Sequence, residues 1–342
     1  MKTNTEKTSV ILDAFLQANG NAVSGDTMAR ALGVSRVSVW GRLQQLRREG
    51  FEFKAATRVG YKLSSTPKVA HAGLLAAWQR SLAARDATPA ATMPAHVLAE
   101  VDSTNDEAGR RLGAGEKTPF AIVASAQTNG RGRRGRAWQS ADGGNLYMSF
   151  AFRPLFPPDN MQGITLAIGL ALCETLAGHC KIPMQVKWPN DLMCDGRKIA
   201  GMLAEARMDA DLVRDIVFGV GLNVNGSLEK LPEELRARAG TLAASAGHDF
   251  DINEIAALCV TTVGTAFERF MREGRCADFD THWGRFDFLR GKTVTASGGG
   301  REVTGTVLGL DTSGALRVRD GAGVEHALNA GEVTLSKENP GI

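Results

Sequence analysis

The residues best suited to chemistry form a short run in which arginines alternate with glycines: Gly130-Arg131-Gly132-Arg133-Arg134-Gly135-Arg136. Guanidinium groups make forked, charge-assisted hydrogen bonds with phosphate and carboxylate oxygens. Glycines let backbone amides approach such a ligand because they carry no side chain. The run therefore predicts a loop that holds an anion, although a basic surface loop without a ligand has the same composition.

The same glycines match the G-x-G-x-x-G pattern of dinucleotide-binding folds at Gly130, Gly132 and Gly135. That pattern binds pyrophosphate where a helix begins at the third glycine and an acidic residue follows about 20 residues later. Residues 137–144 are instead a turn-rich run without a helical apolar period. The sequence therefore argues against a dinucleotide fold.

Three further clusters carry polar residues or glycines, and each is expected to begin at or just beyond the end of a strand. They are Asp102-Ser103-Thr104-Asn105, Lys187-Trp188-Pro189-Asn190-Asp191 and Gly219-Val220-Gly221-Leu222-Asn223, and Gln127 precedes the arginine loop. Loops at strand ends project side chains into clefts. We therefore expect these clusters and the arginine loop to share one site, in which Lys187 supplies a fixed positive charge.

Composition limits the class of protein. The chain has 342 residues, of which 43% are hydrophobic and 23% charged, as in an ordinary globular protein of two or three domains. It contains no apolar run of 18 residues and no apolar signal core at its N-terminus, so we expect a cytoplasmic protein without a membrane partner. Five cysteines without a C-x-x-C pair predict neither a disulfide framework nor a metal site.

The N-terminal segment has the features of a DNA reader. Residues 1–66 carry ten Lys or Arg against five Asp or Glu. Helical patterns over 11–16, 27–32 and 35–49, with Gly33 at the corner, have helix-turn-helix spacing. We expect the third helix to turn Val39, Trp40, Leu43 and Leu46 inward, and residues 51–63 to form a hairpin wing. The residues expected to contact DNA are Arg36, Ser38, Arg42, Gln45, Arg48 and Arg58. A three-helix protein-binding module is the alternative.

The rest of the chain divides into three parts. Residues 67–95 are expected to be a linker with one helix over 72–84. Residues 96–288 predict an α+β domain around a mixed sheet, with strands over 120–126, 146–152, 184–187, 198–206 and 215–224 and helices over 164–177 and 252–271. Residues 289–342 predict a small barrel, with strands over 293–296, 302–310, 316–319 and 324–328.

Taken in order, Asp-Ser-Thr-Asn, Gly-Arg-Gly-Arg-Arg-Gly-Arg, Lys-Trp-Pro-Asn-Asp and Gly-x-Gly-x-Asn resemble the motifs of bacterial biotin protein ligases. The N-terminal helix-turn-helix resembles that of the bifunctional subtype, the biotin operon repressors. The resemblance implies a winged helix-turn-helix, a central domain like that of class II synthetases and an SH3-like barrel. It also implies that biotin and Mg-ATP (Mg2+ with ATP) give biotinyl-5′-adenylate, which acylates a lysine of the biotin carboxyl carrier protein of acetyl-CoA carboxylase.

The resemblance also assigns roles to residues. It implies that Lys187 contacts the biotin carboxylate and the α-phosphate, and that Arg131 and Arg133 hold phosphate and carboxylate oxygens during catalysis. Neutral groups suited to the ureido ring are Ser103, Thr104, Asn105 and Gln127, although Ser103 is also suited to capping a helix. The remaining expected binding residues are Gly130, Gly132, Arg134, Arg136, Trp138, Asn190, Asp191, Gly219, Gly221 and Asn223. A β-turn explains Asn190 and Asp191 equally well.

The resemblance further implies a homodimer that forms when the adenylate is bound and that then binds biotin operator DNA. Three alternatives remain: a ligase whose N-terminal module does not regulate, a lipoate-type ligase on the same scaffold, and a structural or regulatory protein without enzymatic activity. The basic N-terminal segment favours the repressor. The arginine-rich loop favours biotin over lipoate.

Overall fold

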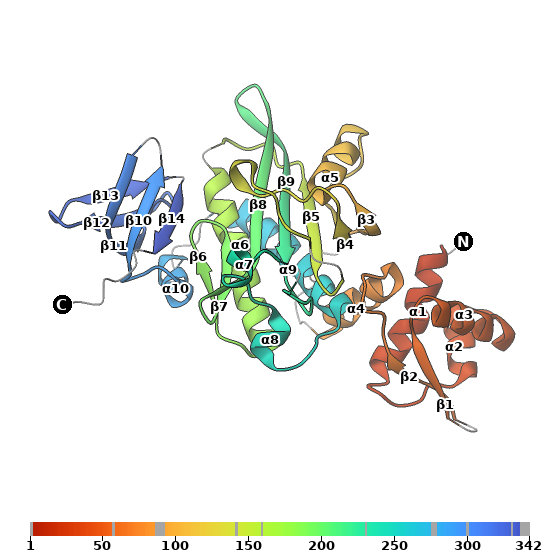
Figure 1. Cartoon of the computed structure of the whole chain (residues 1–342). Helices are drawn as coiled ribbons and strands as arrows, with labels where there is room; N and C mark the ends of the chain where they lie inside the picture. The colour runs from red at the N-terminus through yellow and green to blue at the C-terminus, as the bar shows by residue number, and fades with distance from the viewer. Residues whose placement is uncertain are drawn as a thin grey trace.

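The computed structural model describes residues 3–56, 59–85, 93–140, 143–158, 160–229, 231–274, 279–298, 301–329 and 331–335. Three units follow one another along this part of the chain (Figure 1). They are a helical N-terminal unit with a two-stranded sheet, a central unit around a seven-stranded sheet, and a C-terminal five-stranded sheet. The N-terminal and C-terminal units lie on opposite sides of the central unit (Figure 1).

The N-terminal unit contains α1 (Asn4–Gln17), α2 (Gly25–Leu32), α3 (Arg36–Arg48), β1 (Glu52–Ala56) and β2 (Gly60–Ser65). Ser24 and Ser35 cap α2 and α3, because their side chains accept hydrogen bonds from backbone amides of the first helical turn. Gly33 stands between these helices with a left-handed φ of 65°. The predicted helix-turn-helix and the hairpin after it are confirmed.

The prediction that Trp40 faces inward is wrong. Trp40 is 54% exposed, whereas Val39, Leu43 and Leu46 are buried. An α-helix has about 3.6 residues per turn, so positions i, i+4 and i+7 share one face and the residue after i does not. Val39, Leu43 and Leu46 occupy those positions, and Trp40 is turned toward solvent.

Helix α4 (Ala72–Arg85), predicted within the expected linker, packs against both neighbouring units. It lies along α1 on one side and along α9 (Ile252–Glu273) on the other. Leu74 belongs to the core of the N-terminal unit, while the adjacent Leu75 belongs to the core of the central unit. The helix therefore joins the two cores as a packed element.

The central sheet has the strand order β3-β4-β5-β9-β8-β7-β6. Strands β3 and β4 are parallel and the other neighbours are antiparallel, so the predicted mixed sheet is confirmed. The strands are β3 (Ala95–Val101), β4 (Phe120–Gln127), β5 (Leu146–Phe152), β6 (Met184–Lys187), β7 (Asp191–Cys194), β8 (Arg197–Asp209) and β9 (Leu212–Leu222).

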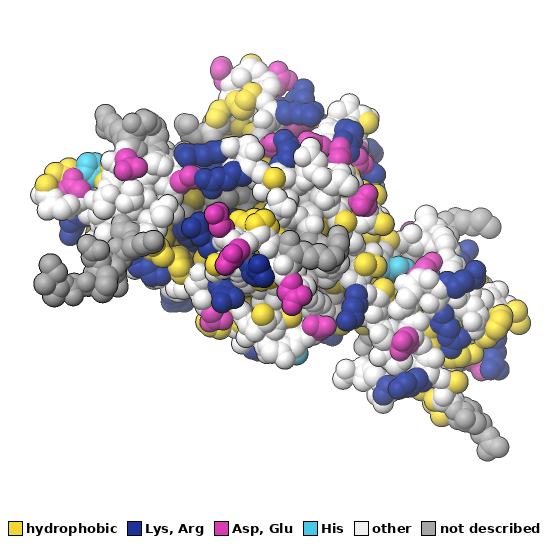
Figure 2. Space-filling view, in the orientation of Figure 1, with side chains coloured by type: hydrophobic (Ala, Val, Ile, Leu, Met, Phe, Trp, Pro, Cys, Tyr) yellow, Lys and Arg dark blue, Asp and Glu magenta, His cyan; other side chains and the backbone are white. Residues whose placement is uncertain are grey.

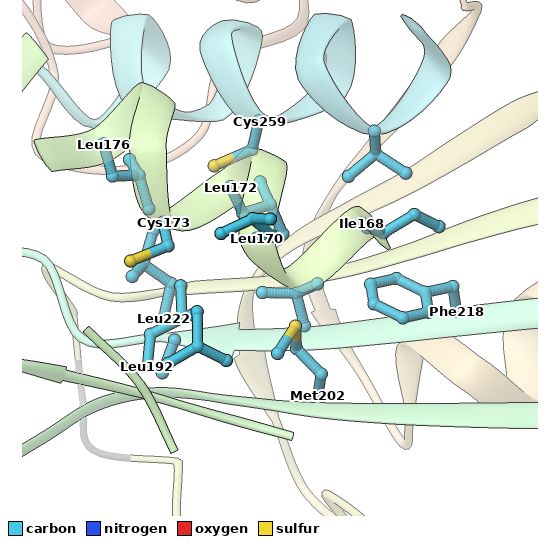
Figure 3. Close-up of a cluster of buried hydrophobic side chains, with 14 of the residues drawn as sticks. Ile168, Leu170, Leu172, Cys173, Leu176, Leu192, Met202, Phe218, Leu222 and Cys259 are labelled. Atoms are coloured by element: carbon cyan, nitrogen blue, oxygen red, sulfur yellow. The ribbon is translucent and has the colours of Figure 1, made fainter. Parts of the chain in front are cut away.

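The two faces of this sheet differ because strand side chains alternate. Along β9, Phe218, Val220 and Leu222 belong to the large core with α6 (Asn160–Cys180) and α9 (Figure 3). Val217 instead packs against α5 (Thr104–Gly113) in a smaller cluster on the other face. Gly219 and Gly221 have the same parity as Val217. At Gly219 and Gly221 this second face has no side chains above β9, and we call this part of it the open face of the sheet.

Helix α6 is apolar enough, by length and composition, to cross a membrane over Met161–Cys180. It packs against α9 and β6. Ile168, Leu172 and Cys173 on this helix contact the core side chains of the sheet (Figure 3). Packing in the core therefore accounts for its apolar character.

The C-terminal unit is an antiparallel sheet with the order β13-β12-β11-β10-β14. Its strands are β10 (Thr293–Gly298), β11 (Arg301–Leu310), β12 (Leu316–Asp320), β13 (Glu325–Leu328) and β14 (Glu332–Leu335). The four predicted strands are confirmed, and β14 was not predicted. The short helical elements elsewhere are η1 (Arg133–Gly135), α7 (Glu233–Arg236), α8 (Leu242–Ala246) and α10 (Phe279–Phe286).

Candidate active site and DNA-binding face

The open face of the central sheet lets neighbouring elements lie directly on the backbone. A Cβ atom added at Gly219 would stand 2.3 Å from Asn105 Oδ1, and one added at Gly221 would stand 2.4 Å from the Trp138 ring. Real Cβ atoms do not approach other atoms this closely, so both positions require glycine in this arrangement. These glycines lie inside β9, and the prediction that their cluster begins at or beyond a strand end is wrong for them.

A chain of neutral hydrogen bonds runs across this face. Gln127 Oε1 accepts from the Thr104 amide at 2.8 Å and from the Thr104 hydroxyl at 3.0 Å. The Ser149 hydroxyl lies 2.8 Å from Thr104 Oγ1 and 2.6 Å from Asn105 Oδ1. Gln127 ends β4, Thr104 and Asn105 begin α5, and Ser149 lies in β5. Three elements thus bring neutral donors and acceptors together.

Arg131 lies beside this chain, between two carboxylates. Its guanidinium is 2.6 Å from Glu205 Oε2 and 2.8 Å from Asp106 Oδ1. Glu205 Oε2 also accepts a hydrogen bond from Asn105 Nδ2 at 2.7 Å. The Arg131 and Glu205 side chains are each 37% exposed, so solvent and solutes reach the pair.

Trp138 lies over the glycines further along the sheet. Its ring is 5.3 Å from the Lys198 ammonium, which also forms a 2.7 Å ion pair with Asp191 Oδ1. The Trp138 indole nitrogen is buried and has no hydrogen-bond partner among the described residues. Buried donors are nearly always paired, so this N–H is a donor for which the described part of the chain supplies no acceptor.

Lys187 and Arg133 are the cations most withdrawn from solvent in this region. Burial lowers the pKa of Lys187, as do Lys198 and Arg238, while Asp191 and Glu332 oppose the shift. Burial likewise lowers the pKa of Arg133, with a contribution from the neighbouring Arg134. An anion placed beside these groups favours their charged forms and relieves that destabilisation.

Other parts of the arginine loop contact the C-terminal sheet. Arg136 forms a 2.5 Å ion pair with Glu332 at the start of β14, and Arg134 lies 3.8 Å from the same carboxylate. Arg133 donates to the Gly331 carbonyl at 3.4 Å and to Asn190 Oδ1 at 3.3 Å. Figure 2 shows Lys and Arg side chains, with carboxylates among them, gathered on the central unit beside the C-terminal sheet. The C-terminal unit therefore forms one wall of the site.

A cavity of about 210 Å³ lies beside Arg133 and Asn190. Pro189 and Met202 line it from the central unit, and Asn329 lines it from the C-terminal unit. Trp188 fixes the neighbouring turn, because its buried indole N–H donates to the Gly314 carbonyl at 3.1 Å. The turn that carries Asn190 is thus held by the C-terminal unit as well as by β6 and β7.

Two predicted binding residues, Ser103 and Asn223, have side chains that hold the backbone of nearby elements. The Ser103 hydroxyl caps α5 by accepting from the Asp106 amide at 3.5 Å. The Asn223 side chain donates to the Gly240 carbonyl at 3.0 Å and so holds a loop beyond β9. The remaining loop glycines act through the backbone: Gly130 packs against the Trp138 carbonyl, and the Gly132 amide donates to the Arg136 carbonyl at 2.7 Å.

Sequence reasoning missed the side chains that contact the predicted site residues, namely Asp106, Ser149, Lys198, Glu205 and Glu332. Ser149 carried a signal, because it is the polar member of an otherwise apolar strand, Leu146–Phe152. The charged residues carried none, because a strand or helix with a charged outer face is ordinary.

On the N-terminal unit, α3 presents an exposed stripe in which apolar side chains adjoin a basic one. Val37 is 76% exposed and Trp40 is 54% exposed. Arg36 adjoins them and lies 3.3 Å from Asp26. Arg48 and Ser38 are also exposed, and the Ser38 hydroxyl bonds the Ser35 cap.

Two other predicted DNA contacts have partners within the unit. Arg42 donates to Thr8 at 3.3 Å and to Asn4, both on α1. Gln45 donates to Glu49 Oε1 at 2.9 Å. Arg58 lies outside the described residues.

An arginine-glycine loop over a mixed sheet, preceded by a helix-turn-helix, is the arrangement expected of an enzyme that carries a DNA-binding module. Residues 97–223 match the biotin/lipoate A/B protein ligase family, residues 290–336 match the biotin protein ligase C-terminal domain, and residues 7–62 match an HTH domain.

Sequence similarity to two bacterial relatives extends over nearly the whole chain. The bifunctional ligase/repressor BirA of Escherichia coli is 31% identical over 98% of both chains. The protein of the same name from Bacillus subtilis is 30% identical over 94% of this chain and 96% of its own. The structure of biotin protein ligase from Aquifex aeolicus in complex with biotin and ATP has 30% sequence identity and a TM-score of 0.61, covering 72% of this chain and 99% of that one. The chain belongs to the family of bifunctional biotin ligases and repressors.

Proposed function

We propose that the site on the open face of the sheet forms biotinyl-5′-adenylate from biotin and ATP. As a member of the bifunctional family, the chain is a biotin ligase and a DNA-binding repressor. In the first step a biotin carboxylate oxygen bonds to the α-phosphorus while the bond to the β-phosphate breaks and pyrophosphate leaves. In the second step a lysine amine of a biotin carboxyl carrier protein attacks the acyl carbon, and AMP leaves.

One observation carries this proposal: a neutral hydrogen-bonding network and a group of cations share one sheet face. Thr104, Asn105 and Gln127 offer donors and acceptors without charge, which suits the ureido ring of biotin. Gly219 keeps the strand below them free of side chains. The vitamin ring would therefore lie over β9 with its carboxylate directed toward the cations.

The cations offset the main electrostatic barrier to the reaction, which is the repulsion between its two anionic substrates. A carboxylate and a triphosphate repel each other, and fixed positive charge between them offsets that repulsion in the transition state. Lys187 and Arg133 are partly buried, where charges interact more strongly than in water. We assign to them, together with Arg131, the stabilisation of charge that develops as oxygen attacks phosphorus.

The nucleotide would lie toward Trp138, Asn190 and Asp191. The Trp138 indole N–H, which has no partner in the part of the chain that the structure describes, supplies a donor, and its ring supplies a stacking surface. No group of three metal-ligating side chains occurs among the described residues. Mg2+ is commonly held by substrate phosphates with one or two carboxylates, so Asp191 would hold magnesium carried by the nucleotide. When bound, magnesium neutralises phosphate charge.

The N-terminal unit would bind biotin operator DNA as an adenylate-dependent homodimer in the cytoplasm. The exposed stripe of α3 supports this part of the proposal. Arg36 and Arg48 suit phosphate or guanine contacts, and Val37 and Trp40 suit apolar contact with thymine methyl groups. Ser38, Arg42 and Gln45 flank this stripe.

The proposal is tested by incubating the full chain with biotin, ATP, Mg2+ and a biotin carboxyl carrier domain. We expect pyrophosphate release and a carrier heavier by one biotinyl group in the mass spectrum. A parallel reaction with lipoate is expected to leave the carrier unmodified. Lipoylation in place of biotinylation, or no adenylate from either acid, would reject the proposal.

A further inference from the structure

Glu205 is the residue at which the neutral network and the arginine loop meet. Its Oε2 atom accepts from Asn105 Nδ2 at 2.7 Å and from Arg131 at 2.6 Å. The chain of contacts continues from Asn105 through Ser149 and Thr104 to Gln127. Gln127 stands just before the arginine loop and Arg131 stands within it. The hydrogen bonds therefore close a ring that begins and ends at the loop.

Without Glu205, the network leaves the orientation of the Asn105 amide open. The Ser149 hydroxyl has a single hydrogen but faces two oxygens, Thr104 Oγ1 and Asn105 Oδ1. If the amide were rotated by half a turn, its NH2 group would donate to Ser149, and Ser149 would donate to Thr104. That alternative places the amide oxygen against the Glu205 carboxylate, which only accepts hydrogen bonds when ionised. The carboxylate selects the observed orientation.

We propose that Glu205 is a positioning residue for biotin adenylation, which rests on the function proposed above. It fixes which end of the Asn105 amide meets the vitamin ring, and it holds Arg131 over that ring through the same oxygen. Occupation of the vitamin pocket and the position of the loop arginine are thereby linked through one carboxylate.

Asp106 provides a matched control because its carboxylate contacts Arg131 at 2.8 Å. Among the described hydrogen bonds, the Asn105 side chain contacts Glu205 and Ser149 and not the Asp106 side chain. Glu205→Gln therefore perturbs both the contact with Asn105 and the contact with Arg131, whereas Asp106→Asn perturbs a contact with Arg131 alone. Both substitutions preserve shape and remove one charge. Glu205→Asp keeps the charge and serves as the conservative variant.

Adenylate formation is measured as pyrophosphate release by the full chain, with biotin and ATP varied separately, and adenylate release is followed by dilution. We expect Glu205→Gln to raise the KM for biotin about tenfold, the scale of one charged hydrogen bond, with the KM for ATP within about twofold. Asp106→Asn should leave the KM for biotin unchanged. Both should speed adenylate release, and neither should speed it further in an Arg131→Ser background. Glu205→Asp should restore most of the biotin affinity.

Equal effects of Glu205→Gln and Asp106→Asn on the KM for biotin would overturn the inference, as would additive effects with Arg131→Ser. A Glu205→Gln chain that loses its cooperative thermal unfolding is replaced by Glu205→Asp. With Glu205→Asp, the role of the charge is supported if adenylate release is as slow as in the parent chain and the KM for biotin is unchanged. A tenfold rise in the KM for biotin in this variant rejects that role. Failure of the parent chain to release pyrophosphate would reject the proposed function instead, so the two failures are distinguishable.

Discussion

Replacing Gly221 by alanine should damage the site far more than its small size suggests. The added Cβ atom would lie 2.4, 2.6 and 2.7 Å from three atoms of the Trp138 ring, whereas ordinary contacts are 3.4–4 Å. The indole would have to move by about 1 Å, a scale of overpacking that costs about 1–3 kcal/mol of stability. A misplacement of that size in a site costs about 100-fold in rate. We therefore expect kcat/KM for adenylate formation to fall about 100-fold.

The control is Gly178→Ala on helix α6. No heavy atom lies within 4 Å of a Cβ atom added there, so the methyl group displaces nothing. Alanine is favoured over glycine in a helix by about 1 kcal/mol, and this variant should be at least as stable as the parent and fully active. Thermal unfolding and steady-state pyrophosphate release compare the two. A Gly221→Ala chain with unchanged kcat/KM would refute the packing argument.

Three further predictions follow from the same contacts. Lys187→Ala should reduce adenylate formation by at least about 100-fold, the scale of one transition-state electrostatic contact, without changing the thermal midpoint by more than a few degrees; retained pyrophosphate release would contradict the role of Lys187. Trp40→Ala should weaken operator binding about tenfold in a titration at fixed salt, because one apolar base contact is lost; unchanged affinity would exclude Trp40 from the interface. The Arg110 guanidinium lowers the pKa of Asp102 to about 2 from 3.8, so their pairing contributes stability above pH 3.8 and loses it as pH falls toward 2; Arg110→Gln should therefore destabilise the chain at neutral pH, and a deficit that persists undiminished at pH 2 would contradict this.

Periodicity predicted most of the fold, and its failures have physical causes. The helices and long strands carry clear apolar stripes, so α6, α9, β5 and β9 were predicted within a few residues. Strands β7 and β14 were not predicted, and each has four residues, so its alternating pattern is a weak signal, although β6 and β13 have the same length and were predicted. Trp40 was predicted to face inward together with Val39, Leu43 and Leu46, yet helix geometry turns it outward.

The sequence predicted the motifs that make up the site, but it did not predict the hydrogen bonds and ion pairs that connect them. Motifs occupy consecutive residues, so Thr104, Gln127 and the arginine loop could be recognised directly. The partners of these residues come from far along the chain: Glu205 is 100 positions from Asn105 and 74 from Arg131. Only the sheet order, which places β9 between β5 and β8, brings them together. Which strands become neighbours in a sheet depends on contacts between residues far apart in the chain, and a motif of consecutive residues does not specify them.

The alternation of side chains along β9 connects the stability of the central unit to its chemistry. Phe218, Val220 and Leu222 supply the core, and Gly219 and Gly221 leave open the face on which Asn105 and Trp138 lie. A shift of one residue in strand register would exchange the two sets, placing glycines in the core and large side chains in the site. The packing energy of the core against α6 and α9 therefore holds the register, and the same register keeps the binding face clear. A well-packed core and an open site thus depend on alternate residues of one strand.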